Sequence, residues 1–157
     1  MCIQESYFLT IAPGRVRCTI EVHTLILELT TTLERIRVLI VDDDPVAIDG
    51  LRSILQAHDD VEVVGDATNG QEVIGKLQEM RPHLVLMDGE TMGSDALGVI
   101  ARVKQESPDV RILLMVVHAD HVGEELEAGA DAFIMKDSGR RELLRAIRSL
   151  GGGHVRW

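Results

Sequence analysis

Short apolar runs alternate with longer amphipathic stretches between residues 36 and 150. The apolar runs predict β-strands at 36–41, 61–64, 84–87, 110–117 and 132–135. Apolar positions at helical spacing predict helices near 45–57, 73–80, 95–105, 124–128 and 140–150. The strands are apolar at nearly every position instead of alternating, so both faces of the sheet should be buried. This pattern predicts a doubly wound α/β fold with five parallel strands.

The first 35 residues do not follow this scheme. Apolar residues alternate with polar ones between Val16 and Val22, and Pro13-Gly14 precedes them as a turn signal. We therefore expect residues 1–35 to be an N-terminal extension that forms either a β-hairpin or a disordered leader. Residues 151–157 follow the last helix as a C-terminal tail or the start of a linker.

Composition narrows the classes of function. The 157 residues are 45% hydrophobic and carry a net charge of −10. An acidic chain of this kind lacks the basic face that binds a phosphate backbone, so we expect no direct contact with nucleic acid. Its apolar runs are far shorter than the ~18 residues that would span a bilayer, which predicts no membrane association. We expect a soluble, cytoplasmic protein.

Polar residues end three of the predicted strands. Asp42 and Asp43 follow the first strand, Asp88 ends the third, and Lys136 follows the fifth. The carboxyl ends of parallel strands meet at one edge of a doubly wound sheet, where sites of this fold class form. Carboxylates brought together there repel one another, and Mg²⁺ relieves such repulsion while keeping several water ligands. Together with the lysine, this predicts a pocket for a phosphoryl group that one carboxylate attacks.

Four segments carrying these residues resemble the receiver domain of bacterial two-component response regulators: LIVDDDP, HLVLMDGE, GADAFIMKD and RRELLRAIRSL. The last two are most similar to the NarL/LuxR-type subgroup. The resemblance covers residues 36–150 and implies a flavodoxin-like, CheY-like (βα)5 fold with strand order 2-1-3-4-5. It also implies that the protein is a signalling switch with at most slow self-dephosphorylation and not a metabolic enzyme.

The resemblance assigns a role to each strand-end residue. Asp88 would be the phosphoacceptor and a metal ligand, with Asp43 as a direct Mg²⁺ ligand and Asp42 acting through water. Glu90 would offer its backbone carbonyl to the metal. Lys136 would contact the phosphoryl oxygens.

The chain departs from the family pattern at one of its two switch positions. Phe133 matches the switch aromatic, but Val116 stands where the family has a Thr or Ser, and residues 109–137 contain neither residue type. The metal and acceptor half of the site is therefore intact while the signalling half is altered. This leaves open a degenerate receiver that works as a binding module without phosphate.

The resemblance also implies the partners. A sensor histidine kinase would donate the phosphoryl group. Output would pass by protein–protein contact, either in a homodimer or to an effector protein, through the face made by the fourth helix, the fifth strand and the fifth helix. Members of the subgroup continue into a DNA-binding helix-turn-helix domain, and no such pattern occurs in these 157 residues.

A second interpretation belongs to a different class. Asp42 and Asp44 satisfy the DxD pattern of haloacid-dehalogenase-like phosphatases, as nucleophile and acid/base. This interpretation is remote, because it leaves Asp88 unexplained and those enzymes need a longer core. Asp44 before Pro45 is more simply explained as a helix cap.

Overall fold

The computed structural model describes residues 34–91, 93–120 and 122–152. The hairpin or leader predicted for the N-terminal extension, and most of the C-terminal tail, lie outside these described residues. In the described part of the chain, no helix has the length and apolar character needed to cross a membrane.

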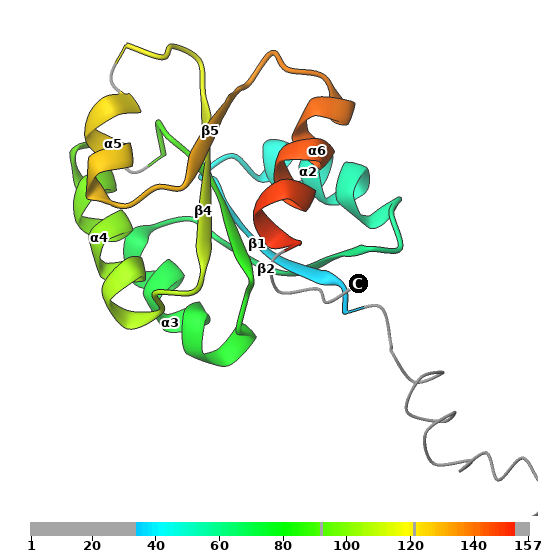
Figure 1. Ribbon diagram of the computed structural model, residues 1–157, viewed down its shortest axis with the longest axis horizontal. Helices are drawn as coiled ribbons and strands as arrows, with labels where there is room; N and C mark the ends of the chain where they lie inside the picture. Colours follow the sequence, from blue (N-terminus) through cyan, green and yellow to red (C-terminus); the bar gives the residue numbers. More distant parts are fainter. Residues whose placement is uncertain (1–33, 92, 121, 153–157) are drawn as a thin grey trace, which may run out of the picture. The chain divides into compact units, whose positions relative to one another are not determined.

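Five strand–helix units follow one another along the chain (Figure 1). The strands are β1 (Ile36–Val41), β2 (Val61–Ala67), β3 (Leu84–Asp88), β4 (Arg111–Val116) and β5 (Ala132–Met135). The helices are α2 (Pro45–Gln56), α3 (Gly70–Met80), α4 (Ala96–Glu106), α5 (Val122–Ala128) and α6 (Arg140–Gly151). A short 3₁₀ turn, η1 (Gly93–Asp95), precedes α4.

The strands form one parallel sheet in the order β2-β1-β3-β4-β5, which confirms the predicted fold. Helices α3, α4 and α5 cover one face and α2 and α6 cover the other (Figure 1). Each face has its own hydrophobic core, and the central strands contribute alternate residues to the two cores. Leu39, for example, packs beneath the first set of helices and Ile40 beneath the second. Burial on both faces explains why the strand sequences are apolar at consecutive positions.

Strand β2 is longer than the apolar run that predicted it. It continues through Gly65 and Asp66 to Ala67, which pairs with Val41 at the end of β1. The register shifts between Val38 and Leu39, so the two strands are not in continuous alignment. β2 is an edge strand, and its added residues pair with β1. Gly65 and Asp66 are only partly buried, whereas Ala67 lies in the core. Hydrophobicity along the sequence does not reveal the pairing of Gly65 and Asp66.

Local hydrogen bonds define the start of α2, which the sequence predicted, and the end of α3. Asp44 caps α2 by accepting a hydrogen bond from the Val46 N–H at 2.9 Å, with Pro45 at the first helical position. Arg81 ends α3 in the left-handed conformation, with φ of 44°. The Arg37 guanidinium donates to the Arg81 carbonyl at 3.2 Å and so satisfies one of the groups left free at the end of α3.

Candidate functional site

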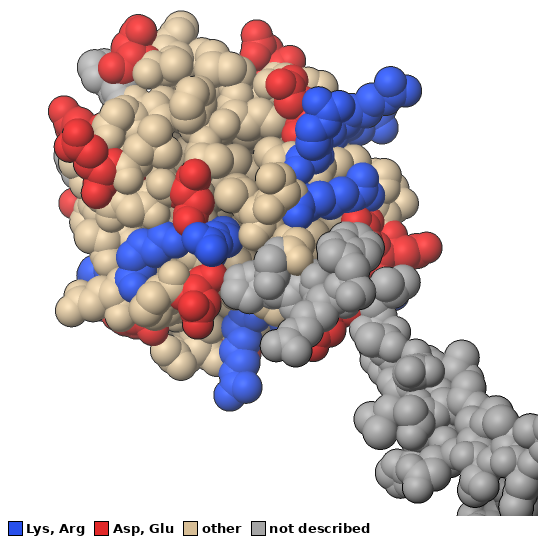
Figure 2. Space-filling view, in the orientation of Figure 1, with Lys and Arg blue, Asp and Glu red and all other residues tan. Residues whose placement is uncertain are grey.

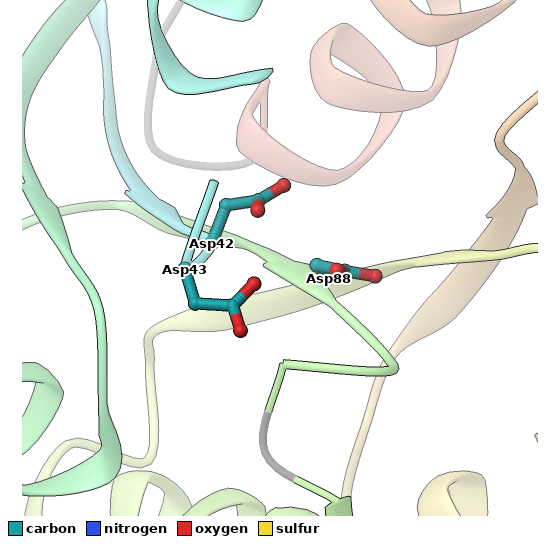
Figure 3. A group of neighbouring side chains, drawn as sticks. All are labelled: Asp42, Asp43 and Asp88. Atoms are coloured by element: carbon teal, nitrogen blue, oxygen red, sulfur yellow. The ribbon is translucent and has the colours of Figure 1, made fainter. Parts of the chain in front are cut away.

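Three carboxylates meet at the carboxyl ends of β1 and β3. One carboxylate oxygen each from Asp42, Asp43 and Asp88 lies within 4.8 Å of the other two, and we call these residues the acidic cluster. Asp42 and Asp88 are each 4% exposed, whereas Asp43 is open to solvent. Figure 3 shows the three side chains together at this edge of the sheet. The structure thus brings together the carboxylates that the strand ends predicted.

Lys136, directly after β5, supplies positive charge to the cluster. Its ammonium nitrogen lies 2.7 Å from Asp88 Oδ1 and 3.6 Å from Glu90 Oε2. The lysine backbone is fixed by an N–H that donates to the Val116 carbonyl at 2.8 Å. The four residues predicted to converge therefore do so, and the lysine touches the predicted phosphoacceptor directly.

Burial and charge set the protonation of two of these groups. Burial raises the pKa of the Asp42 carboxyl, and the negative charges of Asp88 and Asp43 raise it further, against the hydrogen bond from Asp44 and the charge of Lys136. Burial lowers the pKa of Lys136, but the hydrogen bond and charge of Asp88 more than offset this, so the pKa is raised. The site therefore holds a firmly protonated lysine beside carboxylates that repel one another.

Backbone groups orient the two buried carboxylates. The Asp44 N–H donates to Asp42 Oδ1 at 2.9 Å, and the Glu90 N–H donates to Asp88 Oδ1 at 3.1 Å. The Glu90 carbonyl, predicted to face a metal, accepts the Gly93 N–H at 3.2 Å. A carbonyl oxygen has two lone pairs, so this turn hydrogen bond leaves one for another partner.

The cluster suits a hard divalent cation. It offers carboxylate oxygens from three residues within reach of one another, and one of them, Asp43, is open to water. Mg²⁺ takes oxygen ligands, usually one or two carboxylates, and keeps several waters. The donor set and its partial exposure therefore fit the predicted Mg²⁺.

Thr91 is a site residue that the sequence analysis missed. Its hydroxyl oxygen lies 3.0 Å from Asp88 Oδ2 and 3.3 Å from Asp43 Oδ1, and it accepts the Asp43 N–H at 3.2 Å. A hydroxyl three residues after a strand-end aspartate was the available signal. A loop side chain can point in many directions, however, and only the backbone path shows that this one turns inward.

The two switch positions lie at different depths. Val116, at the end of β4, is 8% exposed, and its Cγ1 would lie 3.1 Å from a Cβ added to Gly89. The end of β4, where the sequence predicted that no hydroxyl is present, thus carries a buried methyl group close to Gly89. Phe133, in β5, is 41% exposed.

The DxD interpretation finds no support in the geometry. Asp44, its proposed acid/base, is the N-cap of α2 and accepts the Val46 N–H. Asp88, which that interpretation leaves unexplained, lies inside the acidic cluster.

Comparison with known proteins agrees with this geometry. The family described as response regulator receiver domain matches residues 38–148. The chain is 36% identical over 118 residues to the transcriptional regulatory protein YhcZ of Bacillus subtilis, covering 74% of this chain and 55% of that protein. It is 32% identical over 120 residues to the response regulator protein VraR of Staphylococcus aureus, covering 75% of this chain and 57% of that one. The chain thus spans little more than half the length of these curated relatives.

Solved structures show the same fold. The signal receiver domain of the putative response regulator NarL from Mycobacterium tuberculosis superposes with a TM-score of 0.70 at 30% identity, covering 76% of this chain and 98% of that one. The response regulator domain of Thermotoga maritima CheB superposes with a TM-score of 0.68 at 28% identity, covering 75% of this chain and 97% of that one. With strand-end aspartates and a lysine at one edge of a 2-1-3-4-5 sheet, and relatives of the NarL/LuxR type, the chain belongs to the response regulator receiver domain family.

Proposed function

We propose that this receiver domain accepts a phosphoryl group on Asp88 from the phosphohistidine of a sensor histidine kinase, in a Mg²⁺-dependent reaction. One observation carries the proposal. The buried Asp88 carboxylate lies 2.7 Å from the Lys136 ammonium and within reach of both other carboxylates of the acidic cluster. This arrangement combines a nucleophilic oxygen with positive charge for the incoming phosphoryl oxygens.

The transfer exchanges one bond to phosphorus for another. A carboxylate oxygen of Asp88 forms a bond to phosphorus, and the phosphorus–nitrogen bond of the phosphohistidine breaks with its electron pair returning to the imidazole. Lys136 stays protonated and offers hydrogen bonds to the phosphoryl oxygens, while the Glu90 N–H holds the Asp88 carboxylate in place. Mg²⁺, held by Asp43 and Asp88 directly, by Asp42 through water and by the Glu90 carbonyl, would supply charge neutralisation of the phosphoryl oxygens.

A second function is favoured by one specific observation. Val116 places a buried apolar side chain at the end of β4, where the family carries a hydroxyl that contacts the phosphoryl group. A missing hydrogen bond to a charged group removes about 1.5–3 kcal/mol from the coupling between modification and movement. The alternative is therefore a receiver that binds its partner without needing phosphate.

Signalling in either case would pass through α5, β5 and α6, to a second copy of the chain or to an effector protein. Two large apolar side chains on this face, Phe133 and Leu126, are 41% and 39% exposed. A groove beside β5 is lined by residues of α6, among them Glu142 and Arg145. Figure 2 shows Lys and Arg side chains gathered where α6 lies in Figure 1. An apolar centre beside a basic border suits a protein partner.

The similarity to transcriptional regulatory proteins supports a role in the control of transcription within a two-component system. We expect the protein to act in the cytoplasm. Nucleic acid binding would belong to an effector domain or protein and not to this acidic receiver domain.

Intact-mass measurement after incubation with acetyl phosphate and Mg²⁺ tests the proposal. The wild type should gain one phosphoryl group and Asp88→Asn should gain none. Asp49→Asn, which changes an exposed aspartate of α2, serves as the matched control and should be modified like the wild type. No adduct on the wild type would favour the phosphate-independent alternative, and an adduct that persists in Asp88→Asn would refute the assignment of the phosphoacceptor.

A further inference from the structure

The hydroxyl of Thr91 joins two segments that carry the acidic cluster. It accepts the Asp43 N–H at 3.2 Å and lies 3.0 Å from Asp88 Oδ2 and 3.3 Å from Asp43 Oδ1. A hydroxyl has one proton and two lone pairs, so it can accept the amide proton while it donates to one of the two carboxylates. One side chain thereby links the segment after β1 to the segment after β3.

This hydroxyl enters the site from the segment after β3 and not from the end of β4. The end of β4 contributes the buried, apolar Val116, and residues 109–137 contain no Ser or Thr. Thr91 instead lies three residues after Asp88, in the segment that leaves β3. A side-chain hydroxyl that contacts the carboxylates is therefore supplied from the segment next to Asp88.

The link opposes a specific electrostatic cost. Three carboxylates within 4.8 Å repel one another, and the exposed Asp43 has solvent on one side into which it could turn. Holding Asp43 and Asp88 in one arrangement before a cation arrives reduces the ordering that binding must otherwise supply. A carboxylate accepts at about four lone-pair positions, so the Thr91 contacts leave room on both groups for a metal.

We propose that Thr91 is a positioning residue that prearranges Asp43 and Asp88 for Mg²⁺. This inference rests on the proposed function, because it gives Thr91 a role in assembling the same site. A purely structural threonine would affect the stability of the fold without changing the affinity for the cation, which separates the two possibilities.

Titration calorimetry with MgCl₂ on the full chain provides the test. Thr91→Val keeps the shape of the side chain and removes the hydroxyl, and should weaken Mg²⁺ binding about three- to tenfold, the equivalent of one ordinary hydrogen bond. Thr91→Ser restores the hydroxyl and should bind like the wild type. Thr68→Val is the matched control, since the Thr68 hydroxyl contacts Glu72 and not the acidic cluster.

Urea unfolding of each variant in EDTA accompanies the titration. Thr91→Val and Thr68→Val should show similar small losses of stability, and only Thr91→Val should lose Mg²⁺ affinity. If Thr91→Val does not fold, Thr91→Ala replaces it in the same comparison. Wild-type affinity in the folded variant without the hydroxyl, or failure of Thr91→Ser to restore binding, would overturn the role of Thr91 alone. A wild type that neither binds Mg²⁺ nor takes a phosphoryl group from acetyl phosphate would overturn the proposed function.

Discussion

Aspartates at the two edges of the sheet have contrasting surroundings. We call the edge where the strands begin the amino edge and the edge where they end the carboxyl edge. At the amino edge, Asp131 accepts hydrogen bonds from Lys104 at 2.6 Å, from Arg111 at 2.8 Å and from the Ile112 N–H at 2.8 Å. At the carboxyl edge, three aspartates gather and Lys136 is the one cation that forms an ion pair with them among the residues described. The amino edge supplies two cations to one carboxylate, and the carboxyl edge supplies one cation to three.

The difference separates a carboxylate whose charge is fully paired from carboxylates that we propose hold a metal ion. Asp131 ties α4, β4 and the start of β5 together, and its hydrogen-bonding capacity is largely used. The acidic cluster keeps unused acceptor positions and unpaired negative charge. This charge lowers the stability of the fold, a cost that is common at functional sites. Substitutions at the two edges should therefore change stability in opposite directions.

The largest effect is expected at the amino edge. Asp131→Asn leaves Lys104 and Arg111 without their charged partner, and should lower the free energy of unfolding by about 2–4 kcal/mol. Urea denaturation at neutral pH measures it, with Asp49→Asn as the exposed control. A change no larger than that of the control would mean that Asp131 is not a stabilising tie.

The stabilisation by Asp131 should depend on pH. Burial raises the pKa of its carboxyl, but the hydrogen bonds from Lys104, Ile112 and Arg111 more than offset this, and the pKa is lowered below its ordinary value of 3.8. The unfolded chain therefore takes up the proton at a higher pH than the folded chain. The stabilisation is complete above the ordinary pKa of 3.8 and is lost as the pH falls through the lower pKa of the folded chain.

Urea unfolding across this range checks the prediction. The stability difference between the wild type and Asp131→Asn should be constant above about pH 5 and shrink on acidification below about pH 4. In that range the Asp131 carboxyl of the unfolded chain takes up a proton while that of the folded chain still resists it. A difference that grows as the pH falls would contradict it.

At the carboxyl edge, replacing an aspartate should raise the free energy of unfolding instead of lowering it. Burial and the neighbouring Asp88 raise the pKa of Asp42, so the folded chain disfavours its charged form. Asp42→Asn keeps an oxygen for the Asp44 N–H and removes the charge, and should raise the free energy of unfolding in EDTA by about 1 kcal/mol. A loss as large as that of Asp131→Asn would show that the cluster is a structural feature of the same kind.

The smallest effect is expected for an exposed pair near the amino edge. Arg148 and Asp60 form two hydrogen bonds, at 2.6 and 2.9 Å, yet their side chains are 47% and 39% exposed. Solvent screening limits such pairs, so Arg148→Ala should cost less than about 1 kcal/mol, and the difference should fade in concentrated salt. A larger cost that persists in salt would indicate packing by the arginine stem.

The sequence predicted the carboxyl edge better than the amino edge, for a physical reason. Asp42, Asp43, Asp88 and Lys136 each follow a strand, and parallel strands bring their ends together whatever the details of packing. Asp131 also adjoins a strand, but its partners depend on where the flexible side chains of Lys104 and Arg111 reach. The inward turn of Thr91 and the extension of β2 to Ala67 likewise depend on backbone path and strand pairing, which hydrophobicity does not report.

Mg²⁺ binding tests most directly whether the two edges differ as described. In calorimetric titration, the wild type should bind one Mg²⁺ per chain. Asp43→Asn should lose affinity by about tenfold or more, as expected when a metal ligand is replaced. Asp131→Asn, titrated under conditions in which it is folded, should bind like the wild type. An absence of binding by the wild type, or equal weakening in both variants, would contradict the assignment of the acidic cluster as the magnesium site.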